Sequence, residues 1–376
     1  MAKILFAASV RLGHGGIESH LLSLLPEVAR HHDVLLLSGA TKEFRCALRA
    51  AGIRWLEWGA SHVGDRAARK RLSDVVAAES PDILHVQDAR AAEIARVFLP
   101  RPRPLLAYTV HLAPYHYRGW GGWRDRVLPW IYAQVERVLN FCCTARVIYI
   151  SRRDYDEALR RRLVPLSKAV FLPNGIDLAD FPAPLLPERR EPLLCAVARL
   201  SPEKGVDVLL HAFAIALPDL PRNVRLKIVV DGDLRDELEH LADVLGIATR
   251  VEFAGFLSPE RVRDCLRHSA AFVLLSRHEG RSLAVMEAQA TGLPVIATAV
   301  GDNPFMVSER NGFLVPPEDP KAAARGMVEL FRRRAEWAQM QKAALAQAQN
   351  YDVHRQVAGI LSLYDELLRV AAERQS

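Results

Sequence analysis

Residues 276–298 read Ser-Arg-His-Glu-Gly-Arg-Ser-Leu-Ala-Val-Met-Glu-Ala-Gln-Ala-Thr-Gly-Leu-Pro-Val-Ile-Ala-Thr, and we expect them to join two buried strands. The apolar run 271–275 before them favours a buried parallel strand, and 294–298 favours the next one. Ser282 is suited to cap a short helix, which Gly292 and the following proline would end. The segment therefore predicts strand, loop, short helix and strand within an open α/β sheet.

Two carboxylates in this segment occupy places suited to a ligand. Glu279 lies in the loop ahead of the expected helix, and Glu287 lies about one and a half turns inside it. Both would border the carboxyl end of a parallel strand, where open α/β sheets bind ligands, with the anion site of the helix N-terminus between them. This layout suits a nucleotide sugar, which has hydroxyls at both ends and phosphate in the middle. The alternative is that Glu279 is a loop charge and Glu287 a solvated helix residue.

Glu279-x7-Glu287 followed by Ala-x-Ala-x-Gly-Leu-Pro-Val resembles the signature of the retaining glycosyltransferases of family 4. Two glutamates eight positions apart are common by chance, so the resemblance depends on the strand, helix and Gly-Leu-Pro around them. It implies the GT-B fold: two doubly wound, Rossmann-like α/β domains that face a central cleft, with a C-terminal helix that crosses back to the first domain. The resemblance covers the second half of the chain closely and the first half loosely.

A chain of 376 residues that is half hydrophobic is expected to form two domains. Segment 171–177, Phe-Leu-Pro-Asn-Gly-Ile-Asp, resembles the interdomain segment of the family and contains an Asn-Gly turn signal. We expect an acceptor-binding domain at 1–173 plus a terminal helix at about 357–376, and a nucleotide-sugar-binding domain at 174–356. Strands are expected at 3–9, 33–37, 83–87, 105–111, 146–151, 193–200, 226–231, 251–256, 271–275, 294–298 and 311–317, and the longest helices at 18–30, 320–349 and 357–370.

Arg199 and Lys204 follow the expected strand 193–200 and are candidates to bind a diphosphate. Arginine can bind phosphate oxygens in a bidentate way and lysine as a point charge, so together they suit a pyrophosphate at the strand end. The resemblance implies that they hold the donor diphosphate and stabilise the charge on the leaving group. The alternative is that they are two surface cations.

Further donor contacts come from the resemblance alone. Gly15-Gly16 corresponds to a loop where backbone approaches the donor phosphate or the acceptor, although it could also be a simple tight turn. Segment 255–257, Gly-Phe-Leu, corresponds to the backbone that meets the nucleotide base. The predicted donor-binding residues are Gly15, Gly16, Arg199, Lys204, Gly255, Phe256, Leu257, Glu279, Gly280, Arg281, Ser282, Leu283 and Glu287. Arg281 and Phe305 depart from the residues usual in the family, and both departures concern the sugar pocket.

His111 ends the expected strand 105–111 and matches the family histidine that contacts the transferred sugar, although a lone histidine is often structural. The predicted catalytic set is therefore His111, Arg199, Lys204 and Glu279. His14 and His85 are weaker candidates. Glu18 stands where the dinucleotide-binding fingerprint, Gly-x-Gly-x-x-Gly, has its third glycine. We therefore do not expect a nicotinamide site.

The resemblance implies retaining transfer of a hexose from a UDP- or GDP-linked sugar to an acceptor hydroxyl. The acceptor would belong to a cell-surface glycan: lipopolysaccharide, exopolysaccharide or glycolipid. Five scattered cysteines give no metal spacing and indicate reduced thiols, so we expect no metal and no cofactor beyond the sugar donor. One alternative is a nucleotide-sugar 2-epimerase or hydrolase on the same fold. Another is a non-catalytic nucleotide-sugar-binding protein.

The charge is uneven along the chain. Residues 1–175 have 26 Lys+Arg and 16 Asp+Glu, whereas residues 176–376 have 24 and 28. This split favours a polyanionic partner for the first half, although an arginine-rich composition could also fall unevenly. No apolar run reaches the roughly 18 residues of a membrane span, and no signal peptide is evident at the start. We expect a protein free in the cytoplasm or peripheral on the inner face of the cell membrane, with no nucleic-acid partner.

Segment 115–132 is rich in aromatic residues and arginine. It follows His111 and holds three of the six tryptophans and three of the eight tyrosines. Such residues suit an anionic membrane interface, or they could stack on an acceptor glycan, or they could pack a helix onto the domain core. The predicted membrane or acceptor residues are Arg118, Trp120, Trp123, Arg124 and Arg126, helped by Arg66, Arg69, Lys70 and Arg71.

Overall fold

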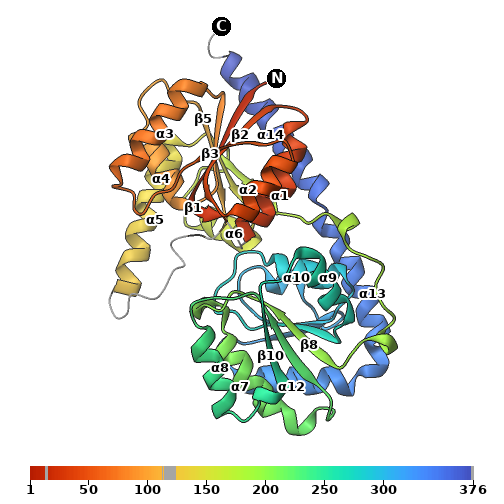
Figure 1. Cartoon of the computed structure of the whole chain (residues 1–376). Helices are drawn as coiled ribbons and strands as arrows, with labels where there is room; N and C mark the ends of the chain where they lie inside the picture. Colours follow the sequence, from red (N-terminus) through yellow and green to blue (C-terminus); the bar gives the residue numbers. More distant parts are fainter. Residues whose placement is uncertain (13–15, 112, 114–123, 374–376) are drawn as a thin grey trace. The chain divides into compact units, whose positions relative to one another are not determined.

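The computed structural model describes residues 1–12, 16–111, 113 and 124–373, with Arg11 and 124–126 described by their backbone alone. It divides into unit 1, Met1–Gly175 with Val353–Ser376, and unit 2, Ile176–Asp352 (Figure 1). The chain leaves unit 1 two residues after the expected boundary and returns four residues before the expected terminal helix.

Unit 1 is built on a parallel sheet with helices on both faces. Its strands lie in the order β3-β2-β1-β4-β5-β6-β7. They are β1 Lys3–Leu12, β2 Asp33–Ala40, β3 Arg54–Glu57, β4 Ile83–Val86, β5 Leu105–Val110, β6 Arg146–Tyr149 and β7 Ala169–Phe171. The helices are α1 Gly16–Ala29, α2 Lys42–Ala50, α3 Arg66–Glu79, α4 Ala89–Phe98, α5 Arg124–Cys143, α6 Arg152–Arg160 and α14 Val353–Glu373.

The central strands of unit 1 are buried on both faces, as expected for a parallel sheet. Along β1, Ile4 and Phe6 point into a core with α1, α2 and α14, while Leu5 and Ala7 point into a core with α3, α4, α5 and α6. The alternation of a strand thus serves two hydrophobic layers, which explains why β1 reads as a continuous apolar run.

Unit 2 has a second parallel sheet, in the order β10-β9-β8-β11-β12-β13, and a single hydrophobic core. Its strands are β8 Leu193–Val197, β9 Arg225–Val229, β10 Val251–Gly255, β11 Ala271–Leu274, β12 Val295–Thr298 and β13 Gly312–Val315. Its helices are α7 Val206–Ala216, α8 Arg235–Val244, α9 Pro259–His268, α10 Leu283–Ala290, α11 Asn303–Met306, α12 Pro320–Arg332 and α13 Trp337–Ala348. The prediction of two doubly wound α/β sheets is confirmed.

Both sheets change winding direction at one point, between β1 and β4 in unit 1 and between β8 and β11 in unit 2. At such a point the two connections run to opposite sides, which leaves room at the carboxyl ends of the strands for a ligand. The loops that follow β8 and β11 therefore border the place where a ligand of unit 2 is expected to bind.

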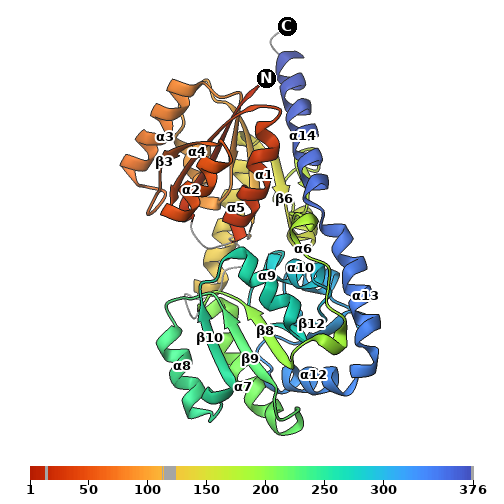
Figure 2. The ribbon, with the colours of Figure 1, turned by 45° about the vertical axis from the view of Figure 1, so that its right-hand side comes forward.

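The C-terminal helix α14 belongs to unit 1, as the resemblance implied. It packs beside α1, and Ile360, Leu363, Tyr364 and Leu367 enter the core of that unit (Figure 2). The hydroxyl of Tyr364 lies 2.6 Å from Nδ1 of His85 on β4, so the helix also makes a buried polar contact with the sheet.

Two features differ from the sequence prediction. The edge strands β3 and β7 were not expected, because β3 begins and ends with an exposed charged residue and β7 is only three residues long and partly buried. A single helix over 320–349 was also predicted, and this is wrong. The helix breaks after Arg332 and resumes at Trp337, whose indole is buried and donates to the carbonyl of Leu330.

Candidate active site

Two loops meet at the switch point of unit 2. The first loop, 198–205, follows β8, and the second loop, 275–282, follows β11. Gly205 ends the first loop with a φ of 60°, and a Cβ at this position would lie 2.2 Å from the carbonyl oxygen of Leu275. The two backbones therefore approach so closely that only glycine fits without a shift in one of the loops.

Arg277 holds the two loops together. Its guanidinium donates to both carboxylate oxygens of Asp207, at 2.9 and 2.7 Å, and its backbone N–H donates to the carbonyl of Glu203 at 2.8 Å. These hydrogen bonds to Asp207, together with an ion pair to Glu318, raise the pKa of Arg277. The residue was not predicted, since nothing local in the sequence reveals a partner seventy positions away.

The loops bring together two of the predicted catalytic residues. Nζ of Lys204 donates to Oε1 of Glu279 at 2.7 Å, and Oγ of Ser276 donates to the same oxygen at 2.7 Å. The Glu279 side chain is 8% exposed, so its carboxylate is held almost out of solvent by a cation and a hydroxyl. A buried charge of this kind needs such partners.

Arg199 is exposed on the first loop. Its charge also reaches Glu203, whose pKa is lowered. Burial would raise that pKa, but a hydrogen bond from Ser201 and the charges of Arg199 and Lys204 outweigh it. The first loop thus has positive potential, with an accessible guanidinium beside a partly buried ammonium.

Helix α10 carries the second carboxylate. Oγ of Ser282 accepts from the N–H of Val285 and caps the helix as predicted, with Gly280 buried and Leu283 partly buried beside it. Glu287 is partly buried inside the helix, and burial raises its pKa from 4.5 to about 7, although the charge of Arg263 acts in the opposite direction. Near neutral pH this carboxyl is therefore divided between its protonated and its ionised form.

The side chain of Arg281 lies within unit 2. It pairs with the buried Asp302 at 3.2 Å, and its guanidinium lies 5.4 Å from the ring centre of Tyr351. The backbone after Val300 packs so tightly on this loop that a Cβ on Gly301 would lie 2.3 Å from the carbonyl oxygen of Glu279. Arg281 thus supports the second loop from inside, while the departing residue Phe305 is 57% exposed.

The predicted base-contacting backbone ends β10. Gly255 has a φ of 66° and its carbonyl accepts from the N–H of Val230 at 2.9 Å. Phe256 next to it is 51% exposed, and Leu257 is partly buried. The turn therefore presents an aromatic face at the carboxyl end of the sheet, where a planar base could stack.

In unit 1 the described catalytic candidate, His111, directly follows β5. Nε2 of His111 lies 3.1 Å from Oε1 of Gln87, and its ring meets that of His20 edge to face at 4.9 Å. Burial, followed by the charges of His20 and His85, holds the pKa of His111 well below its ordinary value, so this imidazole is neutral at pH 7. Gly16 is the first residue of α1.

The weaker histidine candidate His85 is fully buried between Tyr364 and Thr109, with a pKa lowered by burial to about 3, which fits a structural role. Several other candidates lie outside the described residues, or are described by their backbone alone. The former are His14, Gly15, Arg118, Trp120 and Trp123, and the latter are Arg124 and Arg126 on α5.

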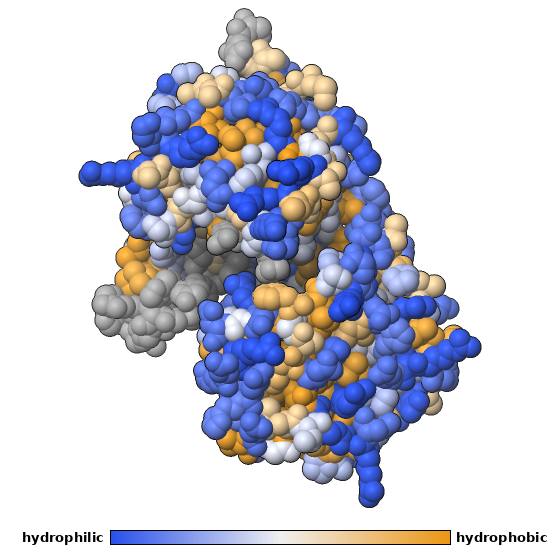
Figure 3. Space-filling view, viewed as in Figure 1, coloured by the Kyte–Doolittle hydropathy of each residue, from blue (hydrophilic) through white to orange (hydrophobic). Residues whose placement is uncertain are grey.

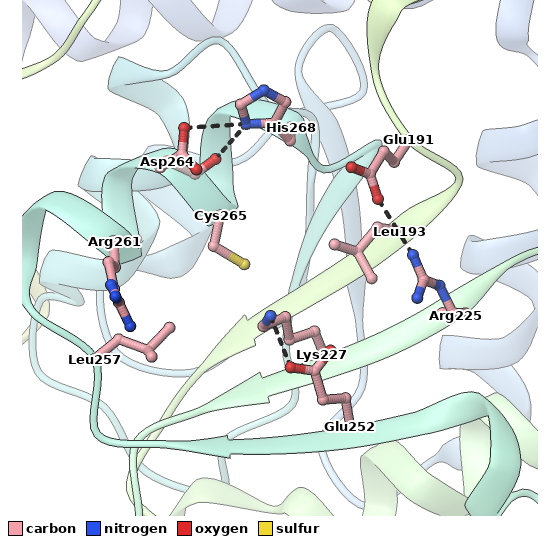
Figure 4. Close-up of a pocket in the computed structure, with 10 residues that line it drawn as sticks. All are labelled: Glu191, Leu193, Arg225, Lys227, Glu252, Leu257, Arg261, Asp264, Cys265 and His268. Carbon is pink, nitrogen blue, oxygen red and sulfur yellow. Dashed lines mark hydrogen bonds and ion pairs between the residues drawn. The ribbon is translucent and has the colours of Figure 1, made fainter.

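A cavity of about 520 Å³ lies elsewhere in unit 2, toward the amino ends of β8 and β9 and against α9 (Figure 4). The side chains around it include the ion pair of Lys227 with Glu252 and the thiol of Cys265, whose Sγ is 3.5 Å from that of Cys195. Leu257 is the one predicted donor-binding residue in its lining, so the cavity is distinct from the loop site. Among the described residues, no cluster of three or more His, Cys, Asp or Glu side chains could hold a metal ion.

Solved structures of low sequence identity share this fold. HepE of Anabaena in complex with UDP-glucose superimposes with a TM-score of 0.82 at 20% identity, over 97% of this chain and 100% of that one. A sucrose-phosphate synthase of Thermosynechococcus elongatus gives a TM-score of 0.79 at 19% identity, over 98% and 100%. The fold of the chain is GT-B.

Curated relatives match over shorter stretches. A D-inositol 3-phosphate glycosyltransferase of Streptomyces scabiei is 36% identical over 44% of this chain and 39% of its own length. A UDP-Gal:alpha-D-GlcNAc-diphosphoundecaprenol alpha-1,3-galactosyltransferase of Escherichia coli is 26% identical over 72% and 71%. The chain spans between 39% and 53% of the length of three such curated relatives.

Two family models match side by side. The model described as Glycosyltransferase Family 4 matches residues 14–180, and the model described as Glycosyl transferases group 1 matches residues 179–347. The first match covers most of unit 1 and the second most of unit 2, including both loops of the candidate site. The chain belongs to glycosyltransferase family 4.

Proposed function

We propose that the protein transfers a hexose from a nucleotide diphosphate sugar to an acceptor hydroxyl, with retention of configuration and without a metal ion. The observation that carries this proposal is the meeting of Lys204 and Glu279 at 2.7 Å at the switch point of unit 2. A cation and a carboxylate held together at the place where such sheets bind ligands can serve both the phosphate and the sugar of one donor.

The diphosphate is assigned to the cationic first loop. Arg199 and Lys204 contribute positive charge, and the N–H groups at the start of α10 contribute the positive end of a helix. As the bond to the sugar breaks, negative charge grows on the leaving oxygen. Groups that are already in place stabilise this charge more than they stabilise the intact donor, and this difference lowers the barrier.

Glu279 is assigned to the sugar, as a group that orients hydroxyls rather than one that attacks. Its contacts with Lys204 and Ser276 fix one carboxylate oxygen and leave acceptor capacity on the group for a sugar hydroxyl. Glu287 is assigned to the ribose hydroxyls, and Gly255, Phe256 and Leu257 to the base. His111 is assigned a contact with the transferred sugar, as a neutral ring able to donate or accept a hydrogen bond.

The acceptor is proposed to be a growing cell-surface glycan carried on a lipid. The Escherichia coli galactosyltransferase named above supports this class, since its name describes a sugar linked to diphosphoundecaprenol as acceptor and UDP-galactose as donor. HepE was solved with UDP-glucose, which also favours UDP over GDP as the nucleotide.

The test is incubation with UDP- and GDP-sugars together with a lipid extract or soluble saccharides. Formation of a glycosylated acceptor with the anomeric configuration of the donor, read by NMR, would support the proposal. A product of inverted configuration would contradict retention. Isomerised or hydrolysed donor in place of transfer would favour an epimerase or hydrolase, and tight binding without turnover would favour a binding protein.

Metal independence is tested in the same assay. Because Arg199, Lys204 and the α10 N-terminus are assigned the charge of the leaving group, EDTA is expected to change the rate less than twofold. A large loss of activity that Mg²⁺ or Mn²⁺ restores would show that a metal ion holds the diphosphate.

A further inference from the structure

Helix α5 presents a row of large apolar side chains to solvent. Of the eighteen exposed large hydrophobic residues found in the described part of the chain, seven lie on this one helix. Trp130 and Val138 are 60% and 59% exposed, and the other five are 37–47% exposed. We call this surface the α5 ridge; it consists of Val127, Trp130, Ile131, Tyr132, Val135, Val138 and Phe141. Single exposed apolar residues are normal, but a contiguous row marks an interaction surface.

The ridge is one face of an amphipathic helix. Its members recur at spacings of three and four residues, which places them along one side of α5. The opposite side packs on unit 1 through the buried residues Ala133, Glu136 and Asn140. The alternative that segment 115–132 packs a helix onto the domain core therefore does not hold for Trp130 and Ile131, which are exposed while other residues occupy the core side of α5.

The exposed charge on the segment that carries the ridge is positive. Glu136 is drawn into the interior, where Arg96 donates to both of its carboxylate oxygens at 3.1 and 2.6 Å. Arg137 is consequently the exposed charged residue of segment 127–143. From Leu99 to Arg146 the sequence has seven arginines and two acidic residues, of which Glu136 is one, so this stretch of the chain carries a strong positive charge.

A neighbouring apolar spot extends this surface. Val97 and Phe98, at the end of α4, are 48% and 38% exposed, and α4 packs against α5. The guanidinium of Arg69 on α3 lies 4.1 Å from the ring centre of Phe98. Part of the apolar area is visible in orange beside grey atoms in Figure 3, at the place that α5 has in Figure 1.

We propose that the α5 ridge is a membrane-docking surface, with its side chains among the acyl chains of a lipid leaflet and the surrounding arginines against anionic headgroups. A helix with one apolar face can lie in the plane of the lipid–water interface, and tryptophan and tyrosine suit the boundary between the headgroups and the acyl chains. No described helix is long and apolar enough to cross a membrane. The inference rests on the proposed function in one respect only: docking brings the protein to the lipid-linked acceptor proposed above.

Charge favours a lipid surface over a second copy of the chain. Residues 1–175 carry a net charge of +10, and two copies facing each other through this surface would bring like charges together. The exposed side of segment 127–143 offers Arg137 and no acidic partner for it. An anionic leaflet offers acyl chains to the apolar side chains and negative headgroups to the arginines. Each cation near such a surface adds to the attraction.

The experiment is flotation of the whole protein with vesicles of phosphatidylcholine alone and of phosphatidylcholine with 30% phosphatidylglycerol, at low and high salt. We expect binding to the anionic vesicles that weakens as salt rises. The double variant Trp130→Gln, Val138→Gln should lower the partition coefficient at least tenfold. The matched control is Ile215→Gln, Val244→Gln, which replaces two exposed apolar residues of unit 2 and should leave partition unchanged.

Several outcomes would overturn the proposal. One is failure of the wild type to bind anionic vesicles at low salt, and another is equal binding by a ridge variant whose melting curve shows that it is folded. A wild-type dimer in light scattering that the ridge variant abolishes would identify the ridge as a contact between copies. Because flotation is measured without donor, its failure is independent of the proposed transfer, which a detergent-solubilised acceptor tests separately.

Discussion

The carboxyl of Glu287 lowers the stability of the folded protein near and above neutral pH. Its pKa is about 7 in the folded protein and 4.5 for the ordinary carboxyl, so between these values the folded state holds a proton that the unfolded state has lost. The free energy of unfolding therefore falls as pH rises through this window and remains lower above it, by up to about 3 kcal/mol.

We predict that Glu287→Gln raises the melting temperature at pH 8 and leaves it almost unchanged at pH 4.5, because the neutral amide avoids the cost of the buried charge. Thermal unfolding at both pH values measures this. Glu309→Gln, at an exposed glutamate, is the control and should shift neither value. An equal effect of Glu287→Gln at the two pH values would show that its charge is not buried.

The same carboxyl is expected to link donor binding to pH. In the proposed site the ribose hydroxyls donate to the ionised carboxyl, so we expect donor binding to release a proton from Glu287 at pH values below about 7. Affinity for the nucleotide sugar should fall as pH is lowered from 8 to 6, and Glu287→Ala should weaken binding by roughly 1–3 kcal/mol. Calorimetry in buffers of different ionisation enthalpy detects the proton. Unchanged affinity in the alanine variant would remove Glu287 from the donor site.

The two cations of the first loop are predicted to act on the same charge. Arg199→Ala and Lys204→Ala should each lower turnover about 100-fold or more, as is typical when a preorganised contact to developing charge is lost. The double variant should lose less than the product of the two effects, since both side chains serve one diphosphate. Near wild-type rates in both single variants would place the diphosphate elsewhere.

At the scale of elements, the close approach of the two loops depends on Gly205. We predict that Gly205→Ala destabilises the protein and weakens donor binding, because a Cβ would lie 2.2 Å from the Leu275 carbonyl oxygen and would push Lys204 away from Glu279. Gly246→Ala is a matched control, since Gly246 also has positive φ, at 70°, but has open space around it. A melting temperature lowered equally in both variants would mean that backbone conformation alone explains the effect.

The sequence predicted the elements whose pattern is local. Apolar runs located the central strands, and the capping serine with Gly-Leu-Pro located α10. The edge strands β3 and β7 and the break before Trp337 were not predictable, because they depend on pairing and packing with distant residues. In the site, Lys204 and Glu279 could be named from the motif. Arg277 could not, since its role comes from Asp207 across the fold.

At the scale of the molecule, α14 is expected to be indispensable to unit 1. It covers part of the core that α1 and the sheet leave open, with Val357, Ile360, Leu363 and Tyr364 all buried. We predict that a fragment of residues 1–175 is poorly soluble, whereas the same fragment joined by a flexible linker to 353–376 is folded. Solubility and circular dichroism of both would show this. A stably folded 1–175 fragment would contradict it.

The position of α14 at the far end of the chain also sets an order of events during synthesis. A ribosome releases all of unit 2, residues 176–352, before it releases the helix that completes the core of unit 1. The second unit in the sequence can therefore finish folding first, while the first one waits with an apolar surface uncovered. For this chain we therefore expect the second unit to complete its fold before the first, the reverse of the usual order in which domains fold during translation.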